Sequence, residues 1–237
     1  MRRLLPVILL VFSAGTTLAQ DQLADTTFDG LQRIEGANVG TAYVDPSADF
    51  SQFRRVAILD PFVAFRSNWL RDANRGRSRN ISSRDMERMK QDMQSLFRTV
   101  FTERLEAAGF QIVNTADYDV LVLRPAIIDL DVAAPESRTA ARSRVYSVSG
   151  GAATLYLQLV DSVSGDVIAR AIDRSVVRSP FGQITWTNRV TNTADARRVL
   201  GRWADTLVGF LASHYSQPTD PDTDSEAAAE DSADDAE

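Results

Sequence analysis

A long apolar stripe constrains the fold of this chain more than any other feature. Between Ser82 and Ala108, apolar side chains recur at steps of three and four residues, which places them along one side of a helix. Ser82 is suited to cap the first turn, which contains Asp85, and Gly109 suits the left-handed position that ends many helices. Because phenylalanine and leucine continue the side begun by methionine, packing in a core is favoured over a methionine-rich partner groove. The stripe consists of Met86, Met89, Met93, Leu96, Phe97, Val100, Phe101, Leu105 and Ala108.

A second helix and a series of apolar runs complete the expected architecture. Apolar residues at helical spacing predict a final helix from about residue 194 to residue 213. Pro61 is expected to end the first buried strand, and Pro125 to interrupt or bend the longest one. We expect strands at residues 41–44 (an edge strand), 54–62, 110–114, 118–132, 152–160 and 166–177, with a further short strand at 186–190. These elements predict a single-domain α+β fold, in which a mixed, mostly antiparallel sheet of five or six strands carries two long helices packed on one face.

The N-terminus has the composition of an export signal. Residues 1–19 begin with a methionine and two arginines, continue in an apolar run and end in small residues, which is typical of a secretory signal peptide cleaved after Ala19. Gln20 stands where a bacterial lipoprotein would have its lipid-bearing cysteine. We therefore expect a soluble protein of the bacterial periplasm, without a lipid anchor and with no transmembrane span in the mature chain.

Acidic charge is concentrated at the C-terminus. Residues 217–237 contain nine acidic residues, no basic residue and no large apolar residue, so we expect the segment 216–237 to be a disordered tail. The expected organisation is a signal peptide at 1–19, an extended lead-in at 20–40, an α+β domain at 41–215 and this tail.

Composition excludes several kinds of active site. The chain has no cysteine, which excludes disulfides, zinc-thiolate sites and thiol nucleophiles. Its single histidine, His214, disfavours histidine-based triads and multi-histidine metal sites. The patterns of a P-loop, a dinucleotide-binding loop and the serine hydrolases are absent as well. No cofactor, metal ion or catalytic residue is assigned.

Carboxylates are the remaining candidates for catalysis. Asp129 and Asp131 lie two residues apart in an expected strand, which puts them on one face at a separation of about 7 Å. This arrangement is compatible with a carboxylate-based hydrolase or a metal-dependent enzyme, in which Asp60 or Asp161 could take part. The alternation of the two aspartates with apolar residues is equally typical of a half-exposed strand. In that case the carboxylates should be dispersed over the sheet and loops.

The arginine-rich stretch at residues 66–88 is the main candidate for binding. Guanidinium groups bind phosphates and carboxylates at two points, and an aromatic ring can stack on a sugar or a lipid headgroup. An envelope protein, an anionic lipid or an acidic glycan would suit this stretch, whereas nucleic acid is not expected as a partner of an exported chain. The alternative is a solvated loop, or one that folds against the acidic tail. The candidate anion-binding residues are Arg66, Trp69, Arg71, Arg75, Arg77 and Arg79.

The stretch LVDSVSGDVIAR, residues 159–170, has the polar composition of a metal-binding loop. However, the positions that would supply calcium ligands after Asp161 are Val163 and Gly165. A four-residue hairpin turn accounts for every position, because Asp161 can cap the turn amides, residues 162–164 form the body, and Gly165 takes the positive φ that closes it.

Several spaced segments together resemble one bacterial family. They are FDGL (28–31), AYVDPSADFSQFRRVAILDP (42–61), LEAAGFQIV, DVLVLRPAIIDLDV, GGAATLYLQLVDSVSGDVIARAIDR and RWADTL. Over about residues 28–213 the chain resembles the envelope lipoproteins grouped as domain of unknown function 3313. The resemblance implies a secreted or lipid-anchored protein and no particular catalytic residue. Our first hypothesis is therefore a non-enzymatic binding or assembly module of the cell envelope, and the carboxylate enzyme and the anion-binding protein are the alternatives.

Overall fold

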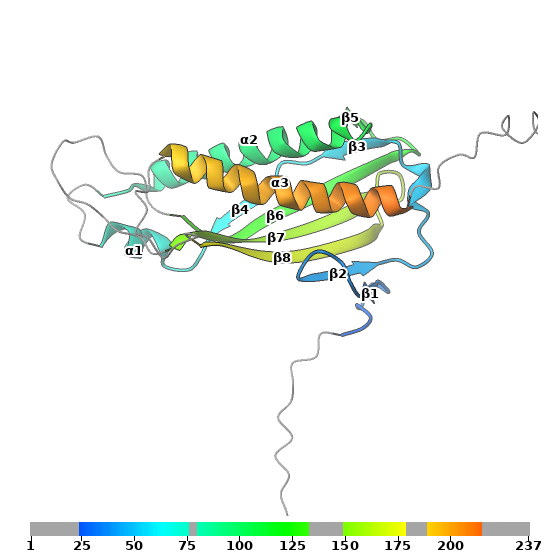
Figure 1. Ribbon diagram of the computed structural model, residues 1–237, viewed down its shortest axis with the longest axis horizontal. Helices are drawn as coiled ribbons and strands as arrows, with labels where there is room; N and C mark the ends of the chain where they lie inside the picture. Colours follow the sequence, from blue (N-terminus) through cyan, green and yellow to red (C-terminus); the bar gives the residue numbers. More distant parts are fainter. Residues whose placement is uncertain (1–23, 76–79, 133–148, 179–188, 215–237) are drawn as a thin grey trace, which may run out of the picture.

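The computed structural model describes residues 24–75, 80–132, 149–178 and 189–214 (Figure 1). The expected signal peptide and acidic tail lie outside these ranges. The strands are β1 (Gln32–Ile34), β2 (Thr41–Val44), β3 (Arg55–Ile58), β4 (Phe62–Phe65), β5 (Gln111–Val113), β6 (Val120–Asp131), β7 (Ser149–Asp161) and β8 (Val167–Arg178). The helices are α1 (Trp69–Asn74), α2 (Ser83–Ala107) and α3 (Arg189–His214), and a 3-10 turn spans Phe50–Gln52.

The described strands form one eight-stranded sheet in the order β1-β2-β8-β7-β6-β3-β5, and β4 also pairs with β6. The β1, β2, β8, β7 and β6 neighbours pair antiparallel, whereas β3 runs parallel to β5 and β6, and β4 runs parallel to β6. The α+β class and the mostly antiparallel sheet are confirmed, but the predicted count of five or six strands is wrong. That count lacked β1, which lies in the expected lead-in, and β4, which resumes pairing directly after Pro61.

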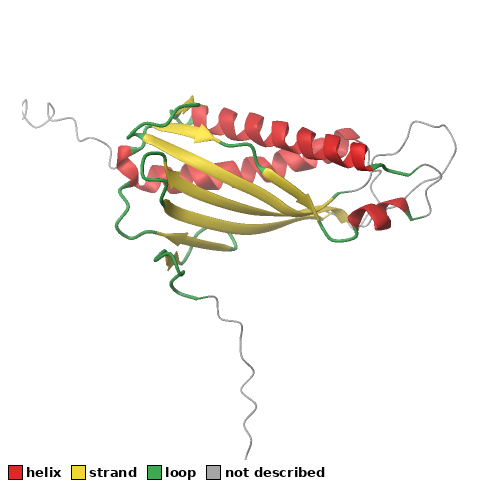
Figure 2. Cartoon of the chain, turned by 180° about the vertical axis from the view of Figure 1, so that it is seen from behind, coloured by secondary structure: helices red, strands yellow, loops and turns green. Residues whose placement is uncertain are grey.

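Both long helices lie on one side of the sheet, as predicted (Figures 1 and 2). The stripe of α2 enters the core through Phe97, Phe101 and Leu105, which are fully buried. The stripe of α3 contributes Trp203 and Leu211 to the same cluster, where they meet side chains from the sheet. Within the described ranges, no helix is long and apolar enough to cross a bilayer.

The ends of α2 follow the predicted capping residues. The Ser82 hydroxyl accepts a hydrogen bond from the Asp85 N–H at 3.2 Å, and the Asp85 carboxylate accepts one from the Ser82 N–H at 3.0 Å. Gly109 follows the helix with a φ of 90°. The final helix is confirmed but begins at Arg189, so the strand predicted at 186–190 is wrong at Arg189 and Val190. Residues 186–188 lie outside the described ranges.

Two irregularities keep β3 and β4 in register with β6. From the pair Ile58–Leu123 to the pair Phe62–Ala126, the connection from β3 to β4 has one residue more than β6. From the pair Val63–Ile127 to the pair Phe65–Leu130, β6 has one residue more than β4. This residue falls at a bulge where Asp129 adopts a φ of 51°, and the two extra residues therefore cancel.

The bend predicted near Pro125 is wrong in its position. Pro125 pairs with Leu157 inside the continuous β6–β7 ladder, and the ladder shifts only between Ile128 and Asp131. Pro125 falls in the interval between the β3 and β4 partners of β6, where the ladder on that side is interrupted anyway.

The turn between β7 and β8 has the predicted form. The Asp161 carboxylate accepts hydrogen bonds from the N–H groups of Val163 (2.7 Å) and Ser164 (3.0 Å). The Gly165 N–H donates to the Asp161 carbonyl at 3.0 Å, and Gly165 has a φ of 79°. The stretch at residues 159–170 is therefore a hairpin turn rather than a metal loop.

The described part of the lead-in is more structured than expected. Its strand β1 pairs with β2, so β2 is an internal strand of the sheet and the prediction of an edge strand at residues 41–44 is wrong. Ahead of β1, Leu31 is fully buried, and the carboxylate of Asp29 forms an ion pair with Arg170 at 2.6 Å. A single buried leucine and one ion pair hold the segment, so no apolar run marks it in the sequence.

Candidate binding surface

The four candidate carboxylates do not form a common site. Asp161 caps the turn beside the start of β6, whereas Asp131 lies at the end of β6, about 33 Å away at strand spacing. Asp131 forms an ion pair with Arg66 at 2.8 Å, and Asp60 forms one with Arg98 at 2.7 Å. The bulge at Asp129 removes the strict alternation that would have placed it beside Asp131. Among the described residues, no group of three or more histidine, cysteine, aspartate or glutamate side chains could hold a metal ion.

The arginine-rich stretch contains a short helix rather than an open loop. Trp69 begins α1, and its side chain is 2 % exposed, with the indole N–H donating to the Val132 carbonyl at 3.0 Å. Its ring packs on Phe65 at a centroid distance of 4.3 Å. The guanidinium of Arg66 contacts Asp131 and also Asp72, at 2.9 Å. We call Arg66, Trp69, Asp72 and Asp131 the helix-end clamp. Two of the predicted binding residues, Arg66 and Trp69, are thus engaged in contacts within the protein.

The other predicted anion-binding residues differ in their surroundings. Arg71 and Arg75 are 68 % and 78 % exposed and approach Asp72 only to 3.7 Å. Arg77 and Arg79 lie outside the described residues. The nearby arginines lower the pKa of the Asp72 carboxyl, with the hydrogen bond from Arg66 as the largest cause. Anion binding by this set stays a prediction, for which Arg71 and Arg75 are the accessible described members.

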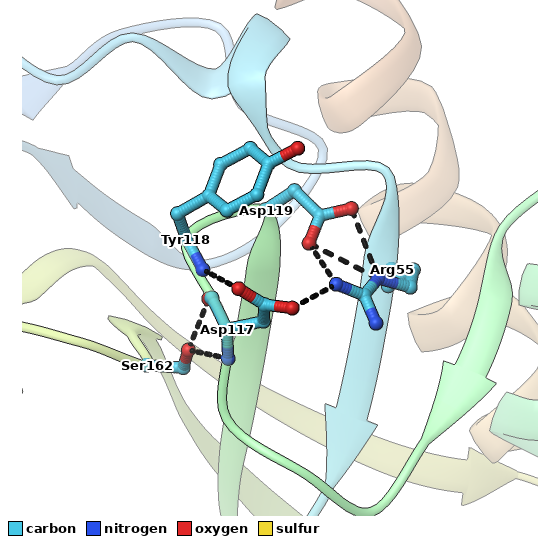
Figure 3. A network of polar contacts seen from close by, with 5 residues as sticks. All are labelled: Arg55, Asp117, Tyr118, Asp119 and Ser162. Atoms are coloured by element: carbon cyan, nitrogen blue, oxygen red, sulfur yellow. Dashed lines mark hydrogen bonds and ion pairs between the residues drawn. The ribbon is translucent and has the colours of Figure 1, made fainter.

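A second arginine holds the opposite end of β6 (Figure 3). Arg55 of β3 binds both oxygens of Asp119, and its Nη2 reaches Asp117 at 2.8 Å. The Ser162 hydroxyl donates to the Asp117 carbonyl at 2.6 Å and accepts from the Asp117 N–H at 3.0 Å. We call Arg55, Asp117, Asp119 and Ser162 the turn-end clamp. Hydrogen bonds from Arg55 are the largest cause that lowers the pKa of both aspartates, and the same bonds raise the pKa of Arg55.

Figure 2 looks onto the side of the sheet away from α2 and α3, which we call the open face. The open face has an apolar row. Alternation along each strand places alternate residues on this face, and residues paired across strands share it. The row consists of the successive partners Phe62, Ala126, Tyr156 and Ile172 on β4, β6, β7 and β8. Phe62 is 65 % exposed and Ile172 is 36 % exposed. This face therefore presents apolar surface that no described helix covers.

Arginines flank the apolar row on the open face. Arg124 and Arg170 are both paired with Gln158 and form a second row on one side of the apolar row. Arg174 lies on the other side of the apolar row. Arg33 belongs to the same cross-strand row as Arg170, through Tyr43. Arg170 is neutralised by Asp29, whereas Arg33, Arg124 and Arg174 make no ion pair within the described residues. The open face thus combines exposed apolar groups with uncompensated positive charge.

Phe28 projects from a turn held beside this face. The Thr27 hydroxyl accepts from the Leu31 N–H at 3.0 Å, the Gly30 N–H donates to the Thr27 carbonyl at 3.0 Å, and Asp29 is paired with Arg170. Phe28 itself is 98 % exposed. An aromatic side chain held on an ordered turn and left in water is typical of an anchor residue at a protein interface.

Sequence reasoning missed the open face and Phe28. The alternation of Val122, Arg124, Ala126 and Ile128 was a usable signal for an uncovered face, because a strand buried on both sides lacks such an arginine. No comparable signal marked Phe28, since phenylalanine is among the residues most often buried.

A model of a protein family matches residues 19–207 of the chain and is described as protein of unknown function (DUF3313). The chain belongs to this family. The match confirms the resemblance drawn from the sequence and covers every described element up to most of α3. No curated protein matches the DUF3313 chain.

The DUF3313 chain is similar to several solved structures. A hemagglutinin homolog from Helicobacter pylori is 14 % identical with a TM-score of 0.41, over 76 % of this chain and 91 % of that one. The PelC dodecamer protein from Paraburkholderia phytofirmans is 12 % identical with a TM-score of 0.36, over 68 % and 91 %. A minor lipoprotein from Acinetobacter baumannii is 13 % identical with a TM-score of 0.34, over 68 % and 94 %. At these scores the likenesses carry no argument about function.

Proposed function

We propose that this DUF3313 protein is an exported, non-enzymatic module of the cell envelope that binds a partner protein through the open face of its sheet. The observation that carries the proposal is Phe28, which is almost completely exposed although its turn is fixed by hydrogen bonds and an ion pair. Fixing the turn in advance lowers the entropy that binding would otherwise cost.

The rest of the open face supports the same role. Phe62 and Ile172 provide apolar contact area, and Arg33, Arg124 and Arg174 favour a partner whose surface is acidic around an apolar centre. The dispersed carboxylates give no support to the enzyme alternative. Export to the periplasm, in soluble form without a lipid anchor, rests on the signal-peptide pattern and on Gln20.

Site-specific photo-cross-linking in the native envelope tests this proposal. A photoreactive phenylalanine analogue at Phe28 should form one reproducible adduct, whereas the same analogue at Val163, which is exposed at the tip of the β7–β8 turn, should not. The adduct at Phe28 should disappear when Ile172→Asp is introduced into the open face. Equal adducts at both positions, or an adduct at Phe28 that survives Ile172→Asp, would overturn the proposal.

Anion binding by the arginine-rich stretch is a second candidate, favoured by the exposure of Arg71 and Arg75. An anionic lipid or an acidic glycan would then contact these two guanidinium groups. Replacing both by glutamine should abolish sedimentation with phosphatidylglycerol vesicles. The assay is performed at low salt, because exposed charge pairs are screened as salt rises. Replacing Arg197 and Arg198 of α3 by glutamine gives the matched control. Sedimentation that is equal in both double variants would remove this candidate.

A further inference from the structure

A groove of about 560 Å³ lies between α3 and the loop that joins β1 to β2, on the helix side of the sheet. Its volume is within the range of small-molecule sites. The groove follows α3 from Arg202 to His214, which corresponds to a length of about 18 Å along the helix. It lies opposite the open face, so an inference about it does not rest on the proposed partner surface.

Small residues create the groove. The floor combines Leu157 and Leu159 of β7 with three alanines, Ala42 of β2 and Ala169 and Ala171 of β8. The two alanines of β8 are paired with the two leucines, and Ala42 is paired with Ala171. Because alanine side chains are short, the surface of the sheet is recessed at this place. On the α3 wall the groove is lined by Gly209, where an added Cβ would meet no heavy atom within 4 Å.

Most of the polar groups that line the groove are engaged within the protein. Asp205 is paired with Arg104 of α2 at 3.5 Å, and the His214 ring nitrogen Nδ1 lies 2.8 Å from the Phe210 carbonyl. Arg202 donates to the Ser175 hydroxyl at 2.7 Å and has no carboxylate partner within the described residues. The exposed Glu35 lies on the opposite, loop wall. One arginine without an acidic partner therefore lies at the end of an apolar channel.

We propose that this groove binds a linear hydrocarbon chain with an anionic head group, with the chain over the alanines and the head group at Arg202. Burial of apolar surface would drive binding, and the guanidinium would provide a charge-assisted hydrogen bond to the head group. A peptide segment fits less well, because the strands of the floor are paired on both sides and offer its backbone few hydrogen-bonding partners. A free fatty acid and an acyl chain of an anionic membrane lipid share this chemistry.

The test measures fluorescence of 11-(dansylamino)undecanoic acid on addition of the purified full-length chain. The wild-type chain should enhance the emission, and Gly209→Leu should abolish the enhancement because the leucine side chain fills the groove. Gly209→Leu should also keep the melting temperature, since the position is helical and the added group enters open space. Ala212→Leu, on the same helix but away from the groove, is the matched control and should bind like the wild type.

A second measurement examines the head group. Dodecanoate should displace the probe about tenfold less effectively from Arg202→Gln than from the wild type, because a hydrogen bond to a charged group is lost. Displacement by 1-dodecanol should be equal for the two chains. Displacement by phosphatidylglycerol vesicles as well as by dodecanoate would identify a membrane lipid as the source, and displacement by dodecanoate alone would identify a free fatty acid. No enhancement by the wild type, undiminished binding by a folded Gly209→Leu, or displacement only by an apolar peptide would overturn the proposal.

Discussion

Both ends of β6 are held by an arginine from the β3–β4 segment, but the surroundings of the two arginines differ. Arg55 binds Asp119, 64 residues further along the chain, and Arg66 binds Asp131, 65 residues further along. In the turn-end clamp, the remaining contacts are polar and join two loops through Ser162. In the helix-end clamp, the carbonyl of the arginine accepts a hydrogen bond from the N–H of a buried tryptophan. We infer that charge stabilises the first end and apolar burial stabilises the second, so that pH and side-chain truncation should separate them.

The largest expected effect is at the helix end. Trp69→Ala should lower the free energy of unfolding by about 3–5 kcal/mol, because it removes a buried aromatic ring and leaves the Val132 carbonyl without its donor. Denaturant unfolding followed by circular dichroism measures the loss. Trp69→Phe, which keeps the ring against Phe65, should recover most of it. A loss below about 1 kcal/mol for the alanine variant would contradict the stabilising role of α1.

The next effect is at the turn end. Gly165→Val should cost about 1–3 kcal/mol, because a β-branched residue is strained at a φ of 79°. Gly165→Asn is the control, since asparagine tolerates this region, and its melting temperature should stay close to that of the wild type. If valine and asparagine behave alike, the turn does not require the left-handed conformation.

A pH titration should distinguish the clamps. The pKa values of Asp117 and Asp119 are lowered in the folded protein, so their contribution to stability is fully present above the unfolded value of about 4 and is lost as pH falls through the lowered values. The difference in unfolding free energy between the wild type and Asp119→Asn should therefore be constant above about pH 5 and shrink below about pH 4. For Trp69→Ala the corresponding difference should not shrink in this range. A pH-independent difference for Asp119→Asn would exclude the charge-based explanation.

The smallest expected effect is that of the helix-end ion pair itself. Arg66→Gln should change the free energy of unfolding by no more than about 1 kcal/mol, since both Arg66 and Asp131 are more than a third exposed. Melting curves at low and high salt give the measurement, and added salt should reduce the difference between variant and wild type. A loss comparable to that of Trp69→Ala would show that the arginine, rather than the tryptophan, holds this end.

Local signals in the sequence predicted the elements whose causes are local. The α2 helix was found through its stripe and caps, and the β7–β8 turn through Asp161 and Gly165, because those residues act on neighbours a few positions away. The strands β1 and β4 were missed because each has at most four residues. The first is held by its pairing with β2, and the second by its pairing with the distant strand β6. The bend in β6 was assigned to Pro125 since a proline is visible in a sequence, whereas the bulge at Asp129 depends on the count of residues in another strand.

The candidate surface was harder to predict than the fold. Six residues were chosen by density of arginine, but density does not reveal that Trp69 is buried by Phe65 or that Arg66 meets an aspartate 65 residues away. The open face and the groove depend on which residues are paired across strands, as with Ala42 and Ala171. Such pairings require the sheet order, which the sequence did not determine.

The matched irregularities of β4 and β6 have a consequence for changes in chain length. A deletion of one residue between Ile58 and Phe62, or of Asp129 alone, would move Arg66 out of step with Asp131 and turn neighbouring side chains from one face to the other. Deleting both residues would restore the register of β4 and β6. Insertions and deletions at these two places should therefore be tolerated together and rejected singly. A homologue that lacks one of the residues is expected to lack the other.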